Sequence, residues 1–258
     1  MDSVCVRLVV SRACGMSRRV QKSFSVGGEI RKSDASPVTV ADFAVQALIL
    51  SDLHEKFPTH KFIAEETSTA LNKDPELCQT VIDVVNEARS NSGFKFGAEE
   101  ICSAIDLGKY DGTDPEETVW VLDPIDGTKG FMRMEQFCIA LGVLQQGKAV
   151  LGILGCPNLN ESLDGSGPRG VIFHAIKGEG SYMQTDDITD VVNTKRLSVS
   201  DVCDPMYGVF MESVESAHSS HALSAQVAAM LGVKSAPIRM DSQAKYGVIA
   251  RGETNLFM

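Results

Sequence analysis

The chain lacks the features that would anchor it in a membrane or cross-link it covalently. Its longest uninterrupted apolar run, residues 137–144, has eight residues, far fewer than the ~20 that a membrane-spanning helix needs. Its seven cysteines include no C-x-x-C pair, and an odd, scattered set fits a reducing compartment better than a disulfide framework or a structural zinc site. We therefore predict free cysteines and no membrane partner.

Positive charge is also scarce. The chain has 24 Lys and Arg residues and 34 Asp and Glu residues, which gives a formal net charge of −10. Proteins that bind nucleic acids in general need a surplus of basic residues to displace counterions, so we expect no nucleic-acid partner. An anionic small molecule would have to be held by local cations or by metal ions. The 258 residues, 43% of them hydrophobic, suffice for one large domain or for two lobes that share a core.

The first 23 residues are rich in arginine and poor in acids, which is typical of organelle transit peptides. However, Val4, Leu8, Val9 and Val20 recur at roughly helical spacing and predict an amphipathic helix with a solvated basic face. We therefore predict a cytoplasmic protein, with a chloroplast or mitochondrion as the alternative.

The two halves of the chain differ in their periodicity. The first half predicts helices over 40–57, 74–89 and 98–107, the second of them capped by Asp74 with Pro75 at its first position, and a strand over 61–66 that ends in two acids. The second half predicts an antiparallel meander of short strands, followed by two helices that end at glycines. The strands are 118–122, 137–144, 149–154, 171–176 and 181–183, and the helices are 222–231 and 242–251. This order predicts an α+β fold.

The stretch Val-Leu-Asp-Pro-Ile-Asp-Gly-Thr-Lys-Gly, residues 121–130, carries two acids at the end of an apolar run. Asp-Pro followed by Asp-Gly is good turn chemistry and needs no function to explain it. The same turn can aim Asp123, Asp126 and the Ile125 carbonyl toward one point, while Gly127–Gly130 offers backbone amides to a phosphate.

Two further acid sites lie where a loop meets a regular element. Asp42 is spaced from Thr39 as in a capping box, and Glu65 with Glu66 could be a solvated strand end. Taken with the stretch 121–130, however, they make a set of carboxylates without histidine or cysteine, which is the ligand chemistry that Mg²⁺ prefers. Metal ions next to a phosphate cradle are what two-metal phosphoester hydrolysis requires: one ion lowers the pKa of a bound water, and another neutralises the leaving oxygen.

Several motifs in the same order resemble a known family. Asp-Pro-Ile-Asp-Gly-Thr, preceded by Ala-Glu-Glu and by Ser-Pro-Val-Thr-Val-Ala-Asp, is similar to the inositol monophosphatase superfamily of Mg²⁺-dependent, lithium-sensitive phosphomonoesterases. Lys32–Thr39, Lys129-Gly-Phe, His218-Ser-Ser-His221 and Asp241–Tyr246 resemble the 3'(2'),5'-bisphosphate nucleotidases within it, particularly the plant and fungal type. The resemblance runs from about residue 19 to the last residue.

The resemblance implies a role for each motif. Asp42 and Thr128 would take a proton from the attacking water, and a carboxylate bonded to a threonine hydroxyl can relay a proton without a histidine. Thr128, His218, Ser242 and Lys245 would contact a bisphosphate nucleotide; the ordinary alternative for the last two is a capped surface helix with a solvated lysine. The implied Mg²⁺ ligands are Glu65, Asp123, the Ile125 carbonyl and Asp126.

The resemblance also implies a layered αβαβα sandwich, with an N-terminal lobe over 1–195 and a C-terminal lobe over 196–258. Relatives carry a later Trp-Asp-x-x-Ala-Gly motif that this sequence lacks, so we expect an incomplete last layer and weakened activity. The predicted reaction is hydrolysis of adenosine 3',5'-bisphosphate to AMP and phosphate by a monomer, with 3'-phosphoadenylyl sulfate as a further substrate. An inositol phosphatase and an inactive nucleotide-binding short isoform are the alternatives.

Overall fold

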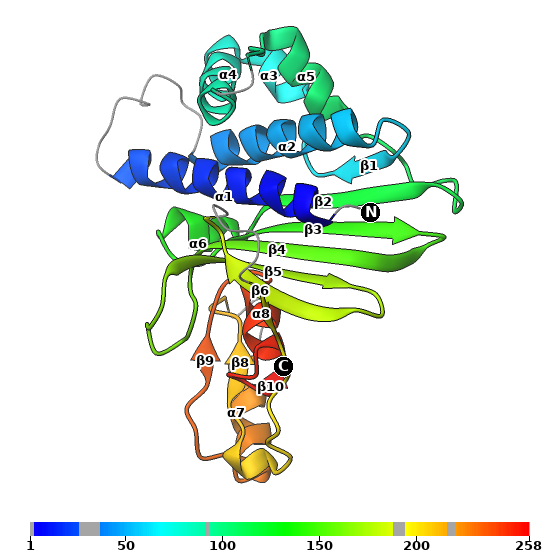
Figure 1. Cartoon of the computed structure of the whole chain (residues 1–258). Coiled ribbons are helices and arrows are strands. Elements are labelled where there is room, and N and C mark those ends of the chain that lie inside the picture. The colour runs from blue at the N-terminus through cyan, green and yellow to red at the C-terminus, as the bar shows by residue number, and fades with distance from the viewer. Residues whose placement is uncertain (1–2, 26–36, 91–92, 188–193, 216–219, 258) are drawn as a thin grey trace.

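The computed structural model describes residues 3–25, 37–90, 93–187, 194–215 and 220–257. It shows an α+β protein built in layers, as predicted (Figure 1). Helices α1 (Ser3–Ser25) and α2 (Pro37–Lys56) cover one face of a seven-stranded sheet. Helix α8 (Ala244–Ala250) contacts both this sheet and a second, three-stranded sheet, beyond which lies α7 (His221–Met230).

The seven-stranded sheet has the strands in chain order, from β1 to β7. The first pair, β1 with β2, is parallel, and every later pair is antiparallel, so the predicted meander is confirmed from β2 onward. The strands are β1 (Lys61–Ala64), β2 (Thr118–Asp126), β3 (Cys138–Gln145), β4 (Lys148–Asn160), β5 (Arg169–Ile176), β6 (Gly180–Thr185) and β7 (Lys195–Arg196).

Three helices follow the end of β1 and pack beyond α2 (Figure 1). They are α3 (Thr69–Lys73), α4 (Pro75–Ala88) and α5 (Ala98–Asp106). The predicted cap of α4 is confirmed, because the Asp74 carboxylate accepts a hydrogen bond from the Leu77 N–H at 2.9 Å and Pro75 occupies the first position. Helix α3 has five residues, too few to show a period in the sequence.

Helix α1 is part of the core rather than a loosely attached segment. The predicted helix is confirmed, but its apolar stripe only in part: Val9 and Val20 are buried, whereas Val4 and Leu8 are exposed. The buried face is completed by Val6, Val10 and Ala13, which pack against α2 and the sheet. The expected solvated basic face is wrong in part. Arg7 is buried with its guanidinium bonded to Gln184, and Arg18 forms an ion pair with Asp186, because charged groups that pack against a sheet need partners.

The second sheet is small and parallel, in the order β10-β8-β9. Its strands are β8 (Phe210–Glu212), β9 (Ile238–Arg239) and β10 (Leu256–Phe257), and a 3-10 helix, Pro205–Tyr207, precedes them. A second hydrophobic cluster, which includes Met211 and Val248, joins this sheet to the first through Phe173 of β5.

Two predictions about absent features can be compared with the described structure. All seven cysteines lie in described residues and are free. None of the helices in the described ranges combines the length and apolar character needed to cross a bilayer.

Candidate functional site

The acids of residues 123–126 lie within strand β2, not in a turn after it. Asp123 pairs with Ala140 and Asp126 with Cys138, so three steps on β2 face two on β3. Such a bulge re-aims side chains, and Pro124 is tolerated there because an irregular position needs no ladder N–H. The predicted turn is therefore wrong, since pairing with β3 carries the strand through the motif. Whether these acids converge on one point depends on the cleft that surrounds them.

An open cleft of about 650 Å³ lies at the end of β2. It is lined by segments that are far apart in the sequence: the end of β1, the bulge, the start of α6 (Thr128–Met132) and the residues just before and within α8. His218 lies outside the described residues. The predicted site residues that line the cleft are Glu65, Asp123, Ile125, Asp126, Thr128, Ser242 and Lys245.

Asp42 lies in the second turn of α2, so the capping-box alternative is wrong: the helix begins at Pro37. It is half-buried, and its pKa is raised to about 8, first by burial and then by the negative charges of Glu66, Glu65 and Asp123. The acid sites around Asp42, after β1 and in β2 are therefore close enough to repel one another.

Asp123 shows the same crowding. Its pKa is raised to about 7, first by burial and then by the negative charges of Asp126 and Glu65. Its buried Oδ1 atom has no hydrogen-bond partner among the described residues. Burial and Glu65 likewise raise the pKa of Glu66. A buried carboxylate oxygen without a donor is costly, and a bound cation would satisfy it.

The chemistry of these residues fits a hard divalent cation. The cleft offers carboxylate oxygens and the Ile125 carbonyl, with no competing imidazole or thiolate among the predicted ligands. Within the described ranges, no three His, Cys, Asp or Glu side chains are already gathered closely enough to bind one ion. Binding would therefore require the carboxylate side chains to rotate toward a shared ion.

The charge crowding predicts how the Asp42→Asn variant should respond to pH without divalent cations. Below pH about 4 the Asp42 carboxyl is protonated in the folded and unfolded states, so the variant should match the wild type. As pH rises toward 8, ionisation is favoured only in the unfolded wild-type chain, so the folded wild type loses stability that the variant keeps. Thermal denaturation from pH 5 to 8 in a chelator should show the variant increasingly more stable, and equal pH dependence in both proteins would contradict the assignment.

Thr128 begins helix α6 and is exposed to solvent. Gly127 precedes it with φ 92°, a backbone conformation that favours glycine, and accepts the Phe131 N–H at 2.9 Å. The helix start that was predicted as a phosphate cradle is thus present. No hydrogen bond joins Asp42 to Thr128 in the described structure, so their joint role stays a prediction.

Ser242 and Lys245 differ from the surface helix that was the ordinary alternative. Helix α8 begins at Ala244, so Ser242 precedes it, with φ 67°. Lys245 is only 7% exposed, and its Nζ atom donates to the carbonyls of Ser242 at 2.8 Å and Met240 at 3.3 Å. Burial lowers the pKa of Lys245, while the nearby charges of Asp126 and Asp241 oppose this. The lysine is therefore built into the wall of the cleft rather than solvated.

An ion-pair network at the rim of the cleft was missed by the sequence interpretation. Lys129 pairs with Glu215 at 2.7 Å, and Arg133 pairs with Glu215 at 2.8 Å and with Asp241 at 2.7 Å. It ties α6, next to the first sheet, to the loops that follow β8 and β9. Its partners lie more than eighty positions apart, so no local pattern could have indicated it.

Comparisons with known proteins place this architecture. The model of the inositol monophosphatase family matches residues 6–258. The chain is 40% identical to 3'(2'),5'-bisphosphate nucleotidase 1 of Arabidopsis thaliana, with 96% of this chain and 74% of that protein covered. It is 40% identical to a 3'(2'),5'-bisphosphate nucleotidase of Oryza sativa, with 100% and 75% covered.

A solved structure gives the same result for the fold. CysQ of Bacteroides thetaiotaomicron, described as a bacterial member of the inositol monophosphatase family, matches with a TM-score of 0.58 at 15% identity, covering 98% of this chain and 77% of that one. Such a low identity bears on the fold alone. The match of the family model over nearly the whole sequence and the 40% identity to two relatives show that this chain belongs to the inositol monophosphatase family.

Proposed function

We propose that this chain is a Mg²⁺-dependent phosphomonoesterase that hydrolyses adenosine 3',5'-bisphosphate to AMP and phosphate. The observation that carries the proposal is the cleft at the end of β2, which gathers seven of the predicted site residues from distant segments. The names of the relatives at 40% identity support the substrate class. On the same grounds, 3'-phosphoadenylyl sulfate is a further substrate.

In this proposal the acidic residues have two separate roles, metal binding and proton transfer. The Mg²⁺ would be held by Glu65, Asp123, Asp126 and the Ile125 carbonyl, all of which line the cleft. When bound, Mg²⁺ would supply a water of lowered pKa and neutralise charge on the leaving oxygen.

Asp42 and Thr128 would move the proton. The Asp42 carboxylate would accept it from the attacking water through the Thr128 hydroxyl, which is exposed at the start of α6 and free to rotate toward substrate. Gly127 holds the chain in the conformation from which the first α6 amides point outward, toward the transferred phosphate.

The nucleotide would contact Ser242 and Lys245, which line the same cleft. The buried ammonium of Lys245 attracts anions without the entropy cost of ordering a mobile side chain. We assign a nucleotide contact to His218 as well, which lies outside the described residues. Thus the lobe over 1–195 contributes the acids and the lobe over 196–258 the nucleotide contacts, and one monomer contains both.

Substrate comparison tests this proposal. Phosphate release from adenosine 3',5'-bisphosphate, 3'-phosphoadenylyl sulfate and inositol 1-phosphate should be measured at the same Mg²⁺ concentration. We expect kcat/KM to be highest for the bisphosphate nucleotide, because only this substrate class uses both the acids and the proposed nucleotide contacts of the cleft. A preference for inositol 1-phosphate would replace the proposal with an inositol phosphatase, and tight nucleotide binding without turnover would replace it with a binding protein.

A further inference from the structure

The segment Glu65–Ser68, which carries the cleft residue Glu65 and its neighbour Glu66, is held by a buried glutamine that has no role in the proposed function. Gln46 lies in α2 and has no exposed surface. Its Nε2 atom donates to the Glu66 carbonyl at 2.8 Å and to the Ile105 carbonyl at 3.0 Å, and its Oε1 atom accepts the Glu66 N–H at 2.9 Å. Both amide protons and the amide oxygen are thus engaged, so the side chain has one orientation.

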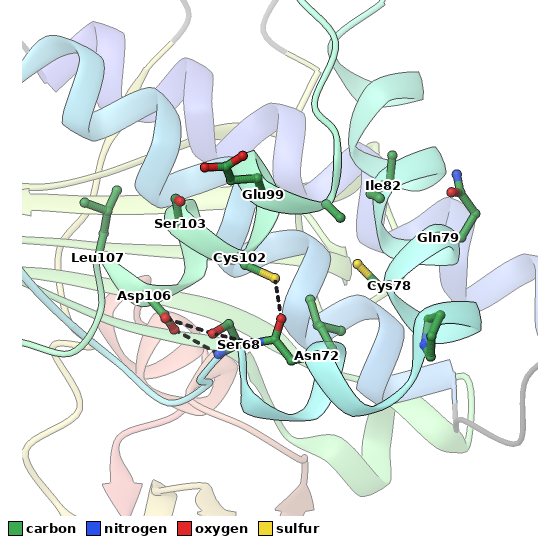
Figure 2. Close-up of a pocket in the computed structure, with 13 residues that line it drawn as sticks. Ser68, Asn72, Cys78, Gln79, Ile82, Glu99, Cys102, Ser103, Asp106 and Leu107 are labelled. Carbon is green, nitrogen blue, oxygen red and sulfur yellow. Dashed lines mark hydrogen bonds between the residues drawn. The ribbon is translucent and has the colours of Figure 1, made fainter.

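The other end of the segment is fixed by α5. The Ser68 N–H and hydroxyl donate to the two oxygens of Asp106 at 2.9 and 2.8 Å, bonds that Figure 2 shows at the edge of the cavity between α3, α4 and α5. Burial opposes ionisation of Asp106, but the bonds from Lys109 and Ser68 outweigh it and lower the pKa of this carboxyl. These are therefore charge-assisted bonds, which are stronger than neutral ones.

The turn after α5 also sets the start of the segment. The Ala64 N–H donates to the Gly108 carbonyl at 3.0 Å. A Cβ atom at Gly108 would lie 2.8 Å from the Ala64 Cβ and 3.2 Å from the Gln46 Nε2, so only glycine allows this close approach. Gln46 lies next to this turn and joins Glu66 to Ile105 in the last turn of α5.

We propose that Gln46 is a positioning residue that fixes the backbone at Glu66, so that the adjacent Glu65 carboxylate faces the cleft at the end of β2 and binds a divalent cation. The inference rests on the proposed function and assigns Gln46 no contact with substrate. Neighbouring carboxylates repel each other, so Glu65 beside Glu66 needs fixed backbone groups to keep it directed to the cleft. Groups that orient metal ligands in this way affect metal affinity more than they affect the fold.

The test compares two variants that lose the same kind of contact. In Gln46→Met the side chain keeps its length but loses its hydrogen bonds. In the control, Asn86→Leu, an amide that donates to the Phe96 carbonyl at 2.9 Å and accepts the Phe96 N–H at 2.8 Å is lost from α4. Asn86 therefore holds one backbone residue of a loop in the same manner, away from the acids.

Two readouts are measured: the rise of the thermal midpoint on adding Mg²⁺ without substrate, and the Mg²⁺ concentration that gives half-maximal phosphate release. We expect Gln46→Met to raise the Mg²⁺ requirement about tenfold or more and to shrink the thermal shift, while kcat at saturating Mg²⁺ changes little. Asn86→Leu should lower the midpoint without Mg²⁺ but leave the Mg²⁺ response unchanged.

If Gln46→Met does not fold, Asp106→Asn provides the second variant, because it weakens only the Ser68 end of the same segment; it should raise the Mg²⁺ requirement in the same direction. A wild-type Mg²⁺ response in Gln46→Met or, where that variant does not fold, in Asp106→Asn would overturn the proposal. So would an equal loss in Asn86→Leu, or a wild-type chain that binds no Mg²⁺. A wild type that binds Mg²⁺ but releases no phosphate would contradict only the proposed function.

Discussion

Replacing Asp126 by Asn should reduce Mg²⁺-dependent phosphate release by at least about 100-fold, or about 2.7 kcal/mol, because a metal ion supplies several kcal/mol of charge stabilisation and this change removes an anionic ligand. The fold should survive. The Asp126 carboxylate accepts the Gln243 N–H and lies 3.4 Å from the Cys138 thiol, and an asparagine oxygen can accept the same N–H. Steady-state kinetics across a Mg²⁺ series, together with thermal denaturation, measures both effects.

A matched control is available on the surface. Asp164 likewise accepts a backbone N–H, that of Ser166 at 2.8 Å, in an exposed turn. Asp164→Asn should leave turnover at the wild-type value. If Asp126→Asn keeps wild-type turnover at low Mg²⁺, the acids of β2 do not bind the ion and the metal assignment is wrong.

Replacing Asp42 by Asn should lower kcat by about 100-fold or more while KM stays within a few fold, since general acid–base catalysis typically contributes that much or more. Asparagine keeps the shape of the side chain and cannot accept the proton. Without cations the same variant should be more stable than the wild type, because it removes a half-buried carboxylate that the negative charges of Glu66 and Glu65 repel. Loss of activity with a gain in stability is expected of a catalytic group and not of a structural one.

Glu55 provides the control for this second variant. It lies on the same helix. Its side chain is 69% exposed and forms a long ion pair with Arg89, 3.9 Å between Nη2 and Oε2. Glu55→Gln should change neither kcat nor stability appreciably, since exposed pairs contribute little. An Asp42→Asn variant that raises KM alone would show that Asp42 binds substrate rather than moving a proton.

The features that could be predicted from the sequence are those with local causes. The cap at Asp74 and Pro75 depends on neighbouring residues, and α1, α4 and the antiparallel strands have clear periods. Two- and three-residue strands such as β8, β9 and β10 show no period, so the second sheet could not be traced in this way.

The bulge in β2 shows why local chemistry was not enough at the site. Asp123-Pro-Ile-Asp126 is suited to a turn, and it becomes a bulged strand because hydrogen bonds to β3 continue on both sides of it. Seven of the nine predicted site residues line one cleft, whereas the backbone that presents the acids of β2 depends on a partner strand.

Roles that depend on long-range partners left no sequence signal. Gln46 is a polar residue in a helix that is buried on nearly all sides. Only its bonds to Glu66 and Ile105, 20 and 59 positions away, explain why a polar side chain is buried there. The network of Arg133 with Glu215 and Asp241 likewise joins residues 82 and 108 positions apart. The Arg133 contacts are set by the packing of α6 and the two sheets together.

We propose that the protein binds Mg²⁺ in the cleft at the end of β2 and there releases phosphate from a bisphosphate nucleotide. The most direct measurement is phosphate release from adenosine 3',5'-bisphosphate by the wild-type chain, in Mg²⁺ and in excess chelator, with Asp126→Asn alongside. Release in Mg²⁺ that stops in chelator and in the variant is the predicted result. Equal release with and without the cation, or in the variant, would contradict the claim.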